Sequence, residues 1–242
     1  PMYVLHYHPA SPAARRVVAL FEEVGLAYEL KHVALERGEH MSPAYLAVNP
    51  NHQVPTLVDG QVVIHESNAI LRYLCHKHGL TDWYPADLAR RAQVEQWLDW
   101  TQCRLFPAMV DIVLNKVFLG PDGDAQAIAR GEARLAELAP ILEAALAANP
   151  YLAGETPTIA DLSAASCITQ LGLASAQPRL PAVTAWSAIC SFRCNQASVP
   201  SAAIVPTGIS NISGRVSAQC AATVESRDRP QRASASVITI TS

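Results

Sequence analysis

The stretch from Asn49 to Ser67 constrains the fold of this chain more than any other, because it combines a loop, a hairpin and a helix start. It reads Asn-Pro-Asn-His-Gln-Val-Pro-Thr-Leu-Val-Asp-Gly-Gln-Val-Val-Ile-His-Glu-Ser. Val54 precedes a proline and is therefore pushed into the extended region. The apolar, β-branched runs on either side of Asp59-Gly60 predict two short strands joined by a tight turn. Ser67 is a natural N-cap, so we expect a helix to start there.

The same stretch carries groups that can hold a small, extended, anionic peptide. Val54 can offer its backbone N–H and C=O to a ligand that lies beside it like an added strand. The helix end at Ser67 presents unpaired N–H groups to a carboxylate, and Glu66 could face an ammonium group. His52 and Gln53 would face the other end of the ligand. The alternative interpretation is a buried hairpin followed by a capped helix, without a ligand.

Two motifs resemble those of a known family. Val-Pro-Thr-Leu-Val-Asp-Gly, followed by Glu-Ser-Asn-Ala-Ile, closely resembles the glutathione-binding half of cytosolic glutathione transferases. The serine-type theta and delta classes and their bacterial relatives look most similar. Leu-Ala-Gly at 152–154 and Thr-Ile-Ala-Asp at 158–161 are similar to a segment in the family's second domain. The resemblance covers roughly residues 2–190, and it implies that Pro55 follows a cis peptide bond and that the bound peptide is glutathione.

The order of elements before residue 80 predicts an α/β domain. Ser11-Pro12 is a typical helix start and Gly25 a typical helix stop. The first strand, helix and second strand predict a parallel pair with a right-handed crossover. We expect strands over 2–7, 28–33, 56–58 and 62–64, and helices over 12–24, 43–47 and 67–78. This βαβαββα order fits the thioredoxin-like glutathione-binding domain that the resemblance implies, here residues 2–79.

Beyond a linker over 80–87, the pattern changes to long amphipathic helices without strands. Pro107 predicts a bend in the first of them and Pro140 a kink in the second. Thr158 with Asp161 three residues later is a capping-box arrangement. We expect helices over 88–119, 125–148 and 162–173, and the start of another at 180–186. We expect these helices to form an all-α domain over residues 88–190, which the resemblance implies to be the electrophile-binding domain.

Residues 191–242 differ from the rest in composition. They are rich in serine and alanine, with scattered proline and glycine and no steady period. Because such a segment cannot bury a packed apolar face, we expect an atypical, disordered tail. The resemblance gives no account of it. One hypothesis is that a reading-frame error replaced the genuine C-terminal helices, and a transcript with an intact frame would dismiss it.

Composition excludes several classes of function. The chain has 242 residues and a net charge of −3, which gives no electrostatic case for nucleic-acid binding. No apolar run reaches the length of a membrane span, and the N-terminus lacks the pattern of an export signal. The six cysteines contain no Cys-x-x-Cys pair, so we expect reduced thiols in a cytoplasmic protein. The histidines lack metal-ligand spacing, and no metal site is expected.

The resemblance implies a catalytic role for Ser11. Glutathione attacks electrophiles as a thiolate, whereas a free thiol is mostly protonated at neutral pH. Ser11 occupies the place of the family's serine, whose hydroxyl donates to the glutathione sulfur, and the dipole of the helix behind it adds a modest positive potential. The alternative is that Ser11 is only a helix cap. Ala10 stands where cysteine-type relatives need a thiol, which counts against those relatives.

The resemblance also implies which residues contact glutathione. His40 occupies the place of a histidine in theta-like members and His52 the place of one in delta-like members, so either could meet the glycine carboxylate. Glu66 and Ser67 would hold the γ-glutamyl end. The full expected set is His40, His52, Gln53, Val54, Pro55, Glu66 and Ser67.

These implications predict a detoxification enzyme, a glutathione transferase that conjugates glutathione thiolate to small apolar electrophiles. Cys103 and Arg104 lie on the helix that lines the electrophile pocket in the family. A homodimer is expected, because family members pair the first domain of one subunit with the second domain of the other. Two alternatives stay open. One is a glutathione-dependent dehalogenase, and the other is a non-catalytic glutathione-binding or assembly module, since folds are reused in this way.

Overall fold

The computed structural model describes residues 2–195, and the predicted tail over 191–242 lies outside the described residues from 196 onward. Its first half contains a four-stranded sheet in the order β2-β1-β3-β4. Strand β1 is parallel to β2 and antiparallel to β3, and β3 is antiparallel to β4. The predicted crossover and hairpin are therefore both present. The strands are β1 (Tyr3–Tyr7), β2 (Tyr28–His32), β3 (Thr56–Asp59) and β4 (Val62–His65).

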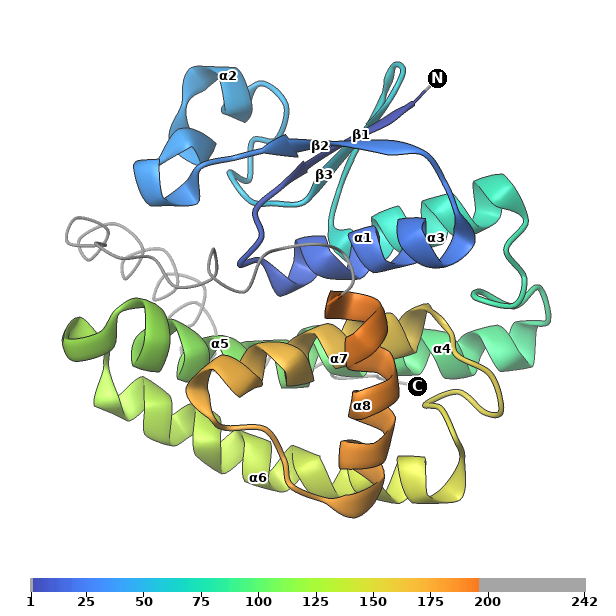
Figure 1. Cartoon of the computed structure of the whole chain (residues 1–242), viewed down its shortest axis with the longest axis vertical. Helices are drawn as coiled ribbons and strands as arrows, with labels where there is room; N and C mark the ends of the chain where they lie inside the picture. The colour runs from blue at the N-terminus through green and yellow to red at the C-terminus, as the bar shows by residue number, and fades with distance from the viewer. Residues whose placement is uncertain (1, 196–242) are drawn as a thin grey trace, which may run out of the picture. The chain divides into compact units, whose positions relative to one another are not determined.

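Helices cover both faces of this sheet. Helices α1 (Pro12–Val24) and α3 (Ser67–His78) lie along one face of the sheet (Figure 1). Leu5 and Leu57 are fully buried in the hydrophobic core together with residues of these two helices. Because successive side chains of a strand point to opposite faces, His6 and Thr56 lie on the other face. There the short helix α2 (Pro43–Leu46) places Tyr45, whose ring lies 5.7 Å from that of His6. The turns η1 (Leu35–Arg37) and η2 (Glu39–Met41) connect β2 to α2.

The first long helix of the second half is interrupted by π-helical turns. It consists of α4 (Leu88–Trp100), a π-turn (Thr101–Leu105), α5 (Phe106–Val113) and a second π-turn (Leu114–Phe118). We expected one helix over 88–119 with a bend at Pro107. Instead a π-turn directly precedes α5, and Pro107 lies in the first turn of α5. Proline lacks an N–H for the helical ladder, and the shift to wider hydrogen bonds accommodates that loss.

Three further helices complete the described part. They are α6 (Ala125–Ala148), α7 (Ile159–Leu171) and α8 (Pro181–Asn195). Helix α8 continues five residues beyond the expected domain end at 190. Its buried residues Val183, Trp186 and Cys190 recur at helical spacing, which gives α8 an apolar face without leucine.

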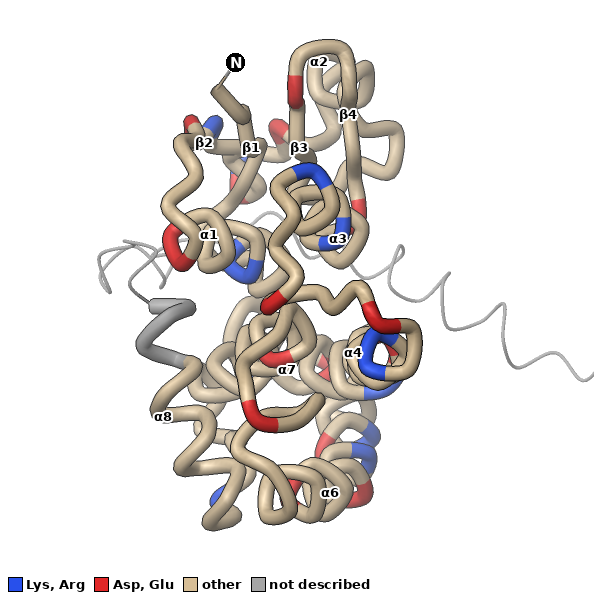
Figure 2. The backbone as a smooth tube through the Cα atoms, turned by 90° about the vertical axis from the view of Figure 1, so that its right-hand side faces the viewer, with Lys and Arg blue, Asp and Glu red and all other residues tan. Residues whose placement is uncertain are grey.

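Helix α7 lies at the centre of the helical half and is buried along almost its whole length. It packs against α1 of the first half (Figure 1). Figure 2 shows charged residues along α4 and α6. No helix within residues 2–195 is both long enough and apolar enough to cross a membrane.

Candidate functional site

Ser11 is the N-cap of α1. Its backbone is extended, with φ −83° and ψ 114°, and its Oγ accepts a hydrogen bond from the N–H of Ala14 at 3.2 Å. This bond uses a lone pair of the hydroxyl and leaves the hydroxyl hydrogen for a ligand. The N–H groups of the first helical turn point the same way, which favours negative charge in front of Ser11. The half-buried hydroxyl can therefore donate to an anionic sulfur.

The loop before β3 is held by two side chains that the sequence did not single out. The carbonyl of Gln53 accepts hydrogen bonds from Tyr45 Oη at 2.6 Å and Asn49 Nδ2 at 2.9 Å. The same two side chains reach the hydroxyl of Thr56. The Val54–Pro55 bond is cis, as the resemblance implies. Asn49 is almost fully buried, and its place in the Asn-Pro-Asn turn was the only sequence signal of this role.

The start of α3 corrects one prediction. Ser67 is the first helical residue, and the N-cap is Glu66, whose side chain makes no capping bond. Glu66 has φ 71° and ψ 108°, a backbone conformation that residues other than glycine rarely adopt and that costs about 1–3 kcal/mol. Such strain is typical of functional sites. This backbone conformation leaves the exposed Glu66 side chain available to other partners, and it places Ser67 at the open N-terminus of a helix.

His40 and His52 lie close enough to interact electrostatically. His40 belongs to η2, and burial followed by the proximity of His52 lowers its pKa. Its Nδ1 is buried and has no hydrogen-bond partner within the part of the chain that the structure describes. A buried polar nitrogen without a partner is unfavourable unless a ligand supplies one. His52 lies in the loop before β3 with φ 48°, and its N–H donates to the carbonyl of Asn49 at 3.0 Å.

Cys103 and Arg104 are exposed residues of the π-turn between α4 and α5. Their role in the electrophile pocket stays a prediction. Phe106, the first residue of α5, contacts the first half, because the Arg16 guanidinium lies 5.9 Å from the centre of its ring. Its position relative to Arg16 follows only from long-range packing.

A polar network joins α7 to the first half. Arg16 of α1 is fully buried and donates to Ser163 Oγ at 2.8 Å and to Ser166 Oγ at 3.1 Å. It also donates to Asn68 Oδ1 at 3.2 Å, directly after Ser67. The start of α3 is thus tied to the helical half. The sequence pattern did not reveal these contacts, since the partners are 52 to 150 residues apart.

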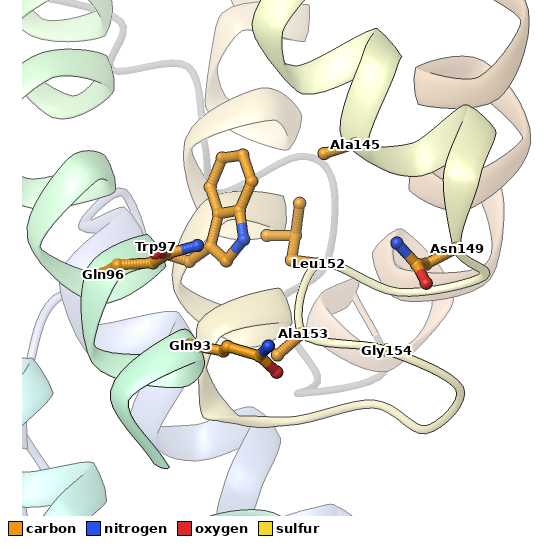
Figure 3. A pocket seen from close by; sticks show the side chains of 8 residues that line it. All are labelled: Gln93, Gln96, Trp97, Ala145, Asn149, Leu152, Ala153 and Gly154. Carbon is orange, nitrogen blue, oxygen red and sulfur yellow. The ribbon is translucent and has the colours of Figure 1, made fainter. Parts of the chain in front are cut away.

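A pocket of about 270 Å³ lies elsewhere, between α4, the end of α6 and the loop that follows it (Figure 3). Trp97 and Leu152 form part of its wall, and Gln93 and Asn149 bring amide groups to it (Figure 3). None of the predicted site residues lines this pocket, and the chemistry considered above does not involve it. Within residues 2–195, no cluster of histidine, cysteine and acidic side chains could hold a metal ion.

Comparisons with known proteins agree with this geometry. Residues 10–77 match the model of the glutathione S-transferase N-terminal domain, and residues 125–188 match that of the C-terminal domain. Glutathione S-transferase 3 of Zea mays is 36% identical over 212 residues, which span 81% of this chain and 94% of that protein. Glutathione S-transferase F10 of Arabidopsis thaliana is 37% identical over 167 residues, covering 67% of this chain and 78% of the relative.

Solved structures give the same result. The theta class glutathione S-transferase from the citrus canker pathogen Xanthomonas axonopodis pv. citri, solved with glutathione bound, superposes with a TM-score of 0.74 at 33% identity. The match spans 81% of this chain and 95% of that one. Glutathione transferase F7 from Populus trichocarpa also gives a TM-score of 0.74, at 28% identity, over 84% and 99% of the two chains. This chain belongs to the glutathione S-transferase family.

Proposed function

We propose that this chain is a serine-type glutathione transferase that conjugates glutathione to small apolar electrophiles. The observation that carries the proposal is the geometry of Ser11, whose Oγ accepts from Ala14 N–H and keeps its hydrogen for the sulfur. We assign glutathione binding to residues 2–79 and electrophile binding to residues 88–190. Thiols such as Cys75, whose pKa burial raises to about 12, would stay unreactive in a cytoplasmic enzyme of this kind.

Glutathione would bind with its sulfur at Ser11 and its two ends held by separate elements. The γ-glutamyl carboxylate would meet the N-terminus of α3 at Ser67, and Glu66 would face its ammonium group. Val54 would pair with the backbone of the bound peptide. The unpartnered Nδ1 of His40 favours His40 over His52 as the contact to the glycine carboxylate, because a hydrogen bond there would satisfy a buried nitrogen.

The chemistry is a nucleophilic substitution or addition by sulfur. The thiol of bound glutathione loses its proton to solvent, and Ser11 stabilises the resulting thiolate by donating a hydrogen bond. With an alkyl or aryl halide the sulfur forms a bond to carbon, the carbon–halogen bond breaks, and halide leaves with the electron pair. The protein forms no covalent intermediate. Its contribution is to raise the fraction of glutathione that is ionised near neutral pH.

We further propose a homodimer. Val62 and Val63 are consecutive residues of β4, the edge strand of the sheet, and their side chains are 43% and 48% exposed. Ile141 of α6 is also about half exposed, at 49%. In a dimer of the type the family forms, the first half of one subunit would cover the second half of the other and bury such side chains.

Two measurements on the purified chain test the function. Calorimetric titration with glutathione reports binding, and conjugation assays with a panel of aryl and alkyl halides report turnover, with halide release measured in parallel. We expect micromolar to millimolar binding and conjugation of at least one aryl halide. Binding without turnover across the panel would favour a non-catalytic module, and absence of binding would refute the proposal.

A further inference from the structure

The peptide unit between Ala10 and Ser11 is held at both ends. Its carbonyl oxygen, on Ala10, accepts a hydrogen bond from Gln170 Nε2 at 3.1 Å. Its N–H, on Ser11, donates to the carbonyl of His8 at 3.0 Å. Because a peptide unit is planar, two hydrogen bonds on opposite sides fix the plane and hence the direction in which the chain enters Ser11.

Gln170, which donates the hydrogen bond to Ala10, belongs to the other half of the molecule. It lies in the last turn of α7, is only 2% exposed, and is 160 residues away from Ala10 along the chain. Its Oε1 accepts from Arg15 Nη2 at 2.5 Å. A guanidinium can only donate, so the amide oxygen of Gln170 must face Arg15 and the amide nitrogen must face Ala10. Arg15 therefore fixes the orientation of the Gln170 side chain.

His8 secures the residue before this peptide unit. The N–H of Ala10 donates to His8 Nδ1 at 3.1 Å, so Nδ1 carries no proton and the ring hydrogen is on Nε2. Nε2 faces Glu36 Oε2 at 3.4 Å, and the ring of His32 lies 5.3 Å away, centre to centre. Burial, followed by the charge of His32, lowers the pKa of His8, whereas Glu36 acts in the opposite direction. His8 is thus neutral at neutral pH.

We propose that Gln170 is a positioning residue for Ser11. Through Gln170, helix α7 of the electrophile-binding half orients the serine hydroxyl toward the glutathione sulfur. The inference rests on the proposed role of Ser11. A hydrogen bond weakens steeply once its angle falls below about 120°, so a rotation of the Ala10–Ser11 peptide that turns the hydroxyl away from the sulfur weakens the bond to the thiolate. The electrophile half thereby takes part in activating the thiol, although it does not touch the thiol.

The decisive substitution is Gln170→Met, which keeps a long unbranched side chain on α7 and removes both polar ends. The bound thiol should then titrate about half a pKa unit higher, and turnover at neutral pH should fall about threefold, with recovery at high pH. Gln170→Asn keeps the amide but is one methylene shorter and cannot bridge Arg15 and Ala10. It should shift the pKa in the same direction, and it serves if the methionine variant does not fold.

Ser166→Ala is the matched control. Ser166 lies one turn earlier on the same buried face of α7, but it contacts Arg16 and not Ala10. It should leave the pKa of the bound thiol unchanged, even if it lowers the free energy of unfolding. The readout is the ultraviolet absorbance of the thiolate in the glutathione complex, measured against pH for each variant.

Ser11→Ala and the double variant Ser11→Ala/Gln170→Met separate the two proposals. The inference predicts that Gln170→Met shifts the thiol pKa when Ser11 is present and adds nothing when it is absent. A normal pKa in both Gln170 variants, beside a raised one in Ser11→Ala, would overturn the inference and leave the function intact. An equal shift in both backgrounds would also overturn it. No shift in Ser11→Ala would overturn both.

Discussion

Replacing Asp161 by alanine should be among the most destabilising single changes in the helical half. The Asp161 side chain is 1% exposed and accepts hydrogen bonds from the N–H of Leu152 at 3.0 Å and from Thr158 N–H at 2.9 Å. It also accepts from the indole N–H of Trp186 at 3.0 Å and from the Thr158 hydroxyl. Burial raises the pKa of the Asp161 carboxyl, while all of these donors favour its ionised form. One carboxylate thus holds a loop, the start of α7 and a residue of α8 together.

The magnitude follows from the donors left behind. Alanine leaves the N–H groups of Leu152, Thr158 and Trp186 without their partner, and all three residues are at least 96% buried. Each buried unsatisfied group costs about 1–3 kcal/mol. We therefore expect Asp161→Ala to lower the free energy of unfolding by at least ~3 kcal/mol, at the summed lower limit of that range.

Asp161→Asn is the informative partner variant. Its amide oxygen can keep the bonds from Leu152 and Trp186, which both go to Oδ1, whereas its amide nitrogen opposes the N–H of Thr158. One donor is then unsatisfied, and the cost should be about 1–3 kcal/mol. Urea denaturation followed by tryptophan fluorescence and circular dichroism measures both variants. A loss clearly below about 3 kcal/mol for alanine, or equal losses for both variants, would contradict the assigned role of the Asp161 carboxylate.

Four other predictions concern the first half. Glu66→Ala should raise KM for glutathione and leave kcat nearly unchanged, because the proposed contact of Glu66 with the ammonium group of glutathione is remote from the sulfur. A fall in kcat with an unchanged KM would contradict this role. Glu66→Gly should unfold at a higher urea concentration than Glu66→Ala, since glycine adopts φ 71° without strain. Burial lowers the pKa of His8 and His40 below the ordinary 6.5, so the unfolded chain binds more protons and stability should fall as pH drops below that value. The double variant His8→Asn/His40→Asn should flatten this loss of stability in urea titrations between pH 8 and 5, provided that the variant folds. One pKa unit corresponds to roughly 1.36 kcal/mol of stability. An unchanged dependence of stability on pH would exclude these two histidines as its cause. Val63→Lys should lower the molar mass measured by light scattering from that of a dimer to that of a monomer. A monomeric wild type would refute the proposed dimer itself.

Local signals predicted much of the fold. Helix α1 begins after Ser11 and ends before Gly25, where the sequence predicted both limits, because a serine–proline start and a glycine stop act within a few residues. The bounds of α6 also agree with the prediction. The capping box of Thr158 and Asp161 is present as predicted, although its further bonds to Leu152 and Trp186 were not foreseen.

What the sequence did not reveal depends on long-range packing or on unusual backbone. Nothing in the sequence indicates that Glu66 has a positive φ, so the sequence alone predicts Ser67 as the N-cap. The π-turns beside α5 depend on how the helix packs, and Pro107 predicts only a bend in a continuous helix. Gln170 meets Ala10 across 160 residues, and only the docking of α7 on α1 brings them together.

Ser11 is proposed to activate glutathione by stabilising its thiolate, and a single titration decides whether it does. A hydrogen bond to a charged group contributes about 1.5–3 kcal/mol, and one pKa unit corresponds to about 1.36 kcal/mol. Thiolate absorbance of the glutathione complex should therefore show a pKa about one to two units higher in Ser11→Ala than in the wild type. Equal thiol pKa values in the two proteins, with glutathione bound in both, would contradict the account and leave Ser11 as a helix cap.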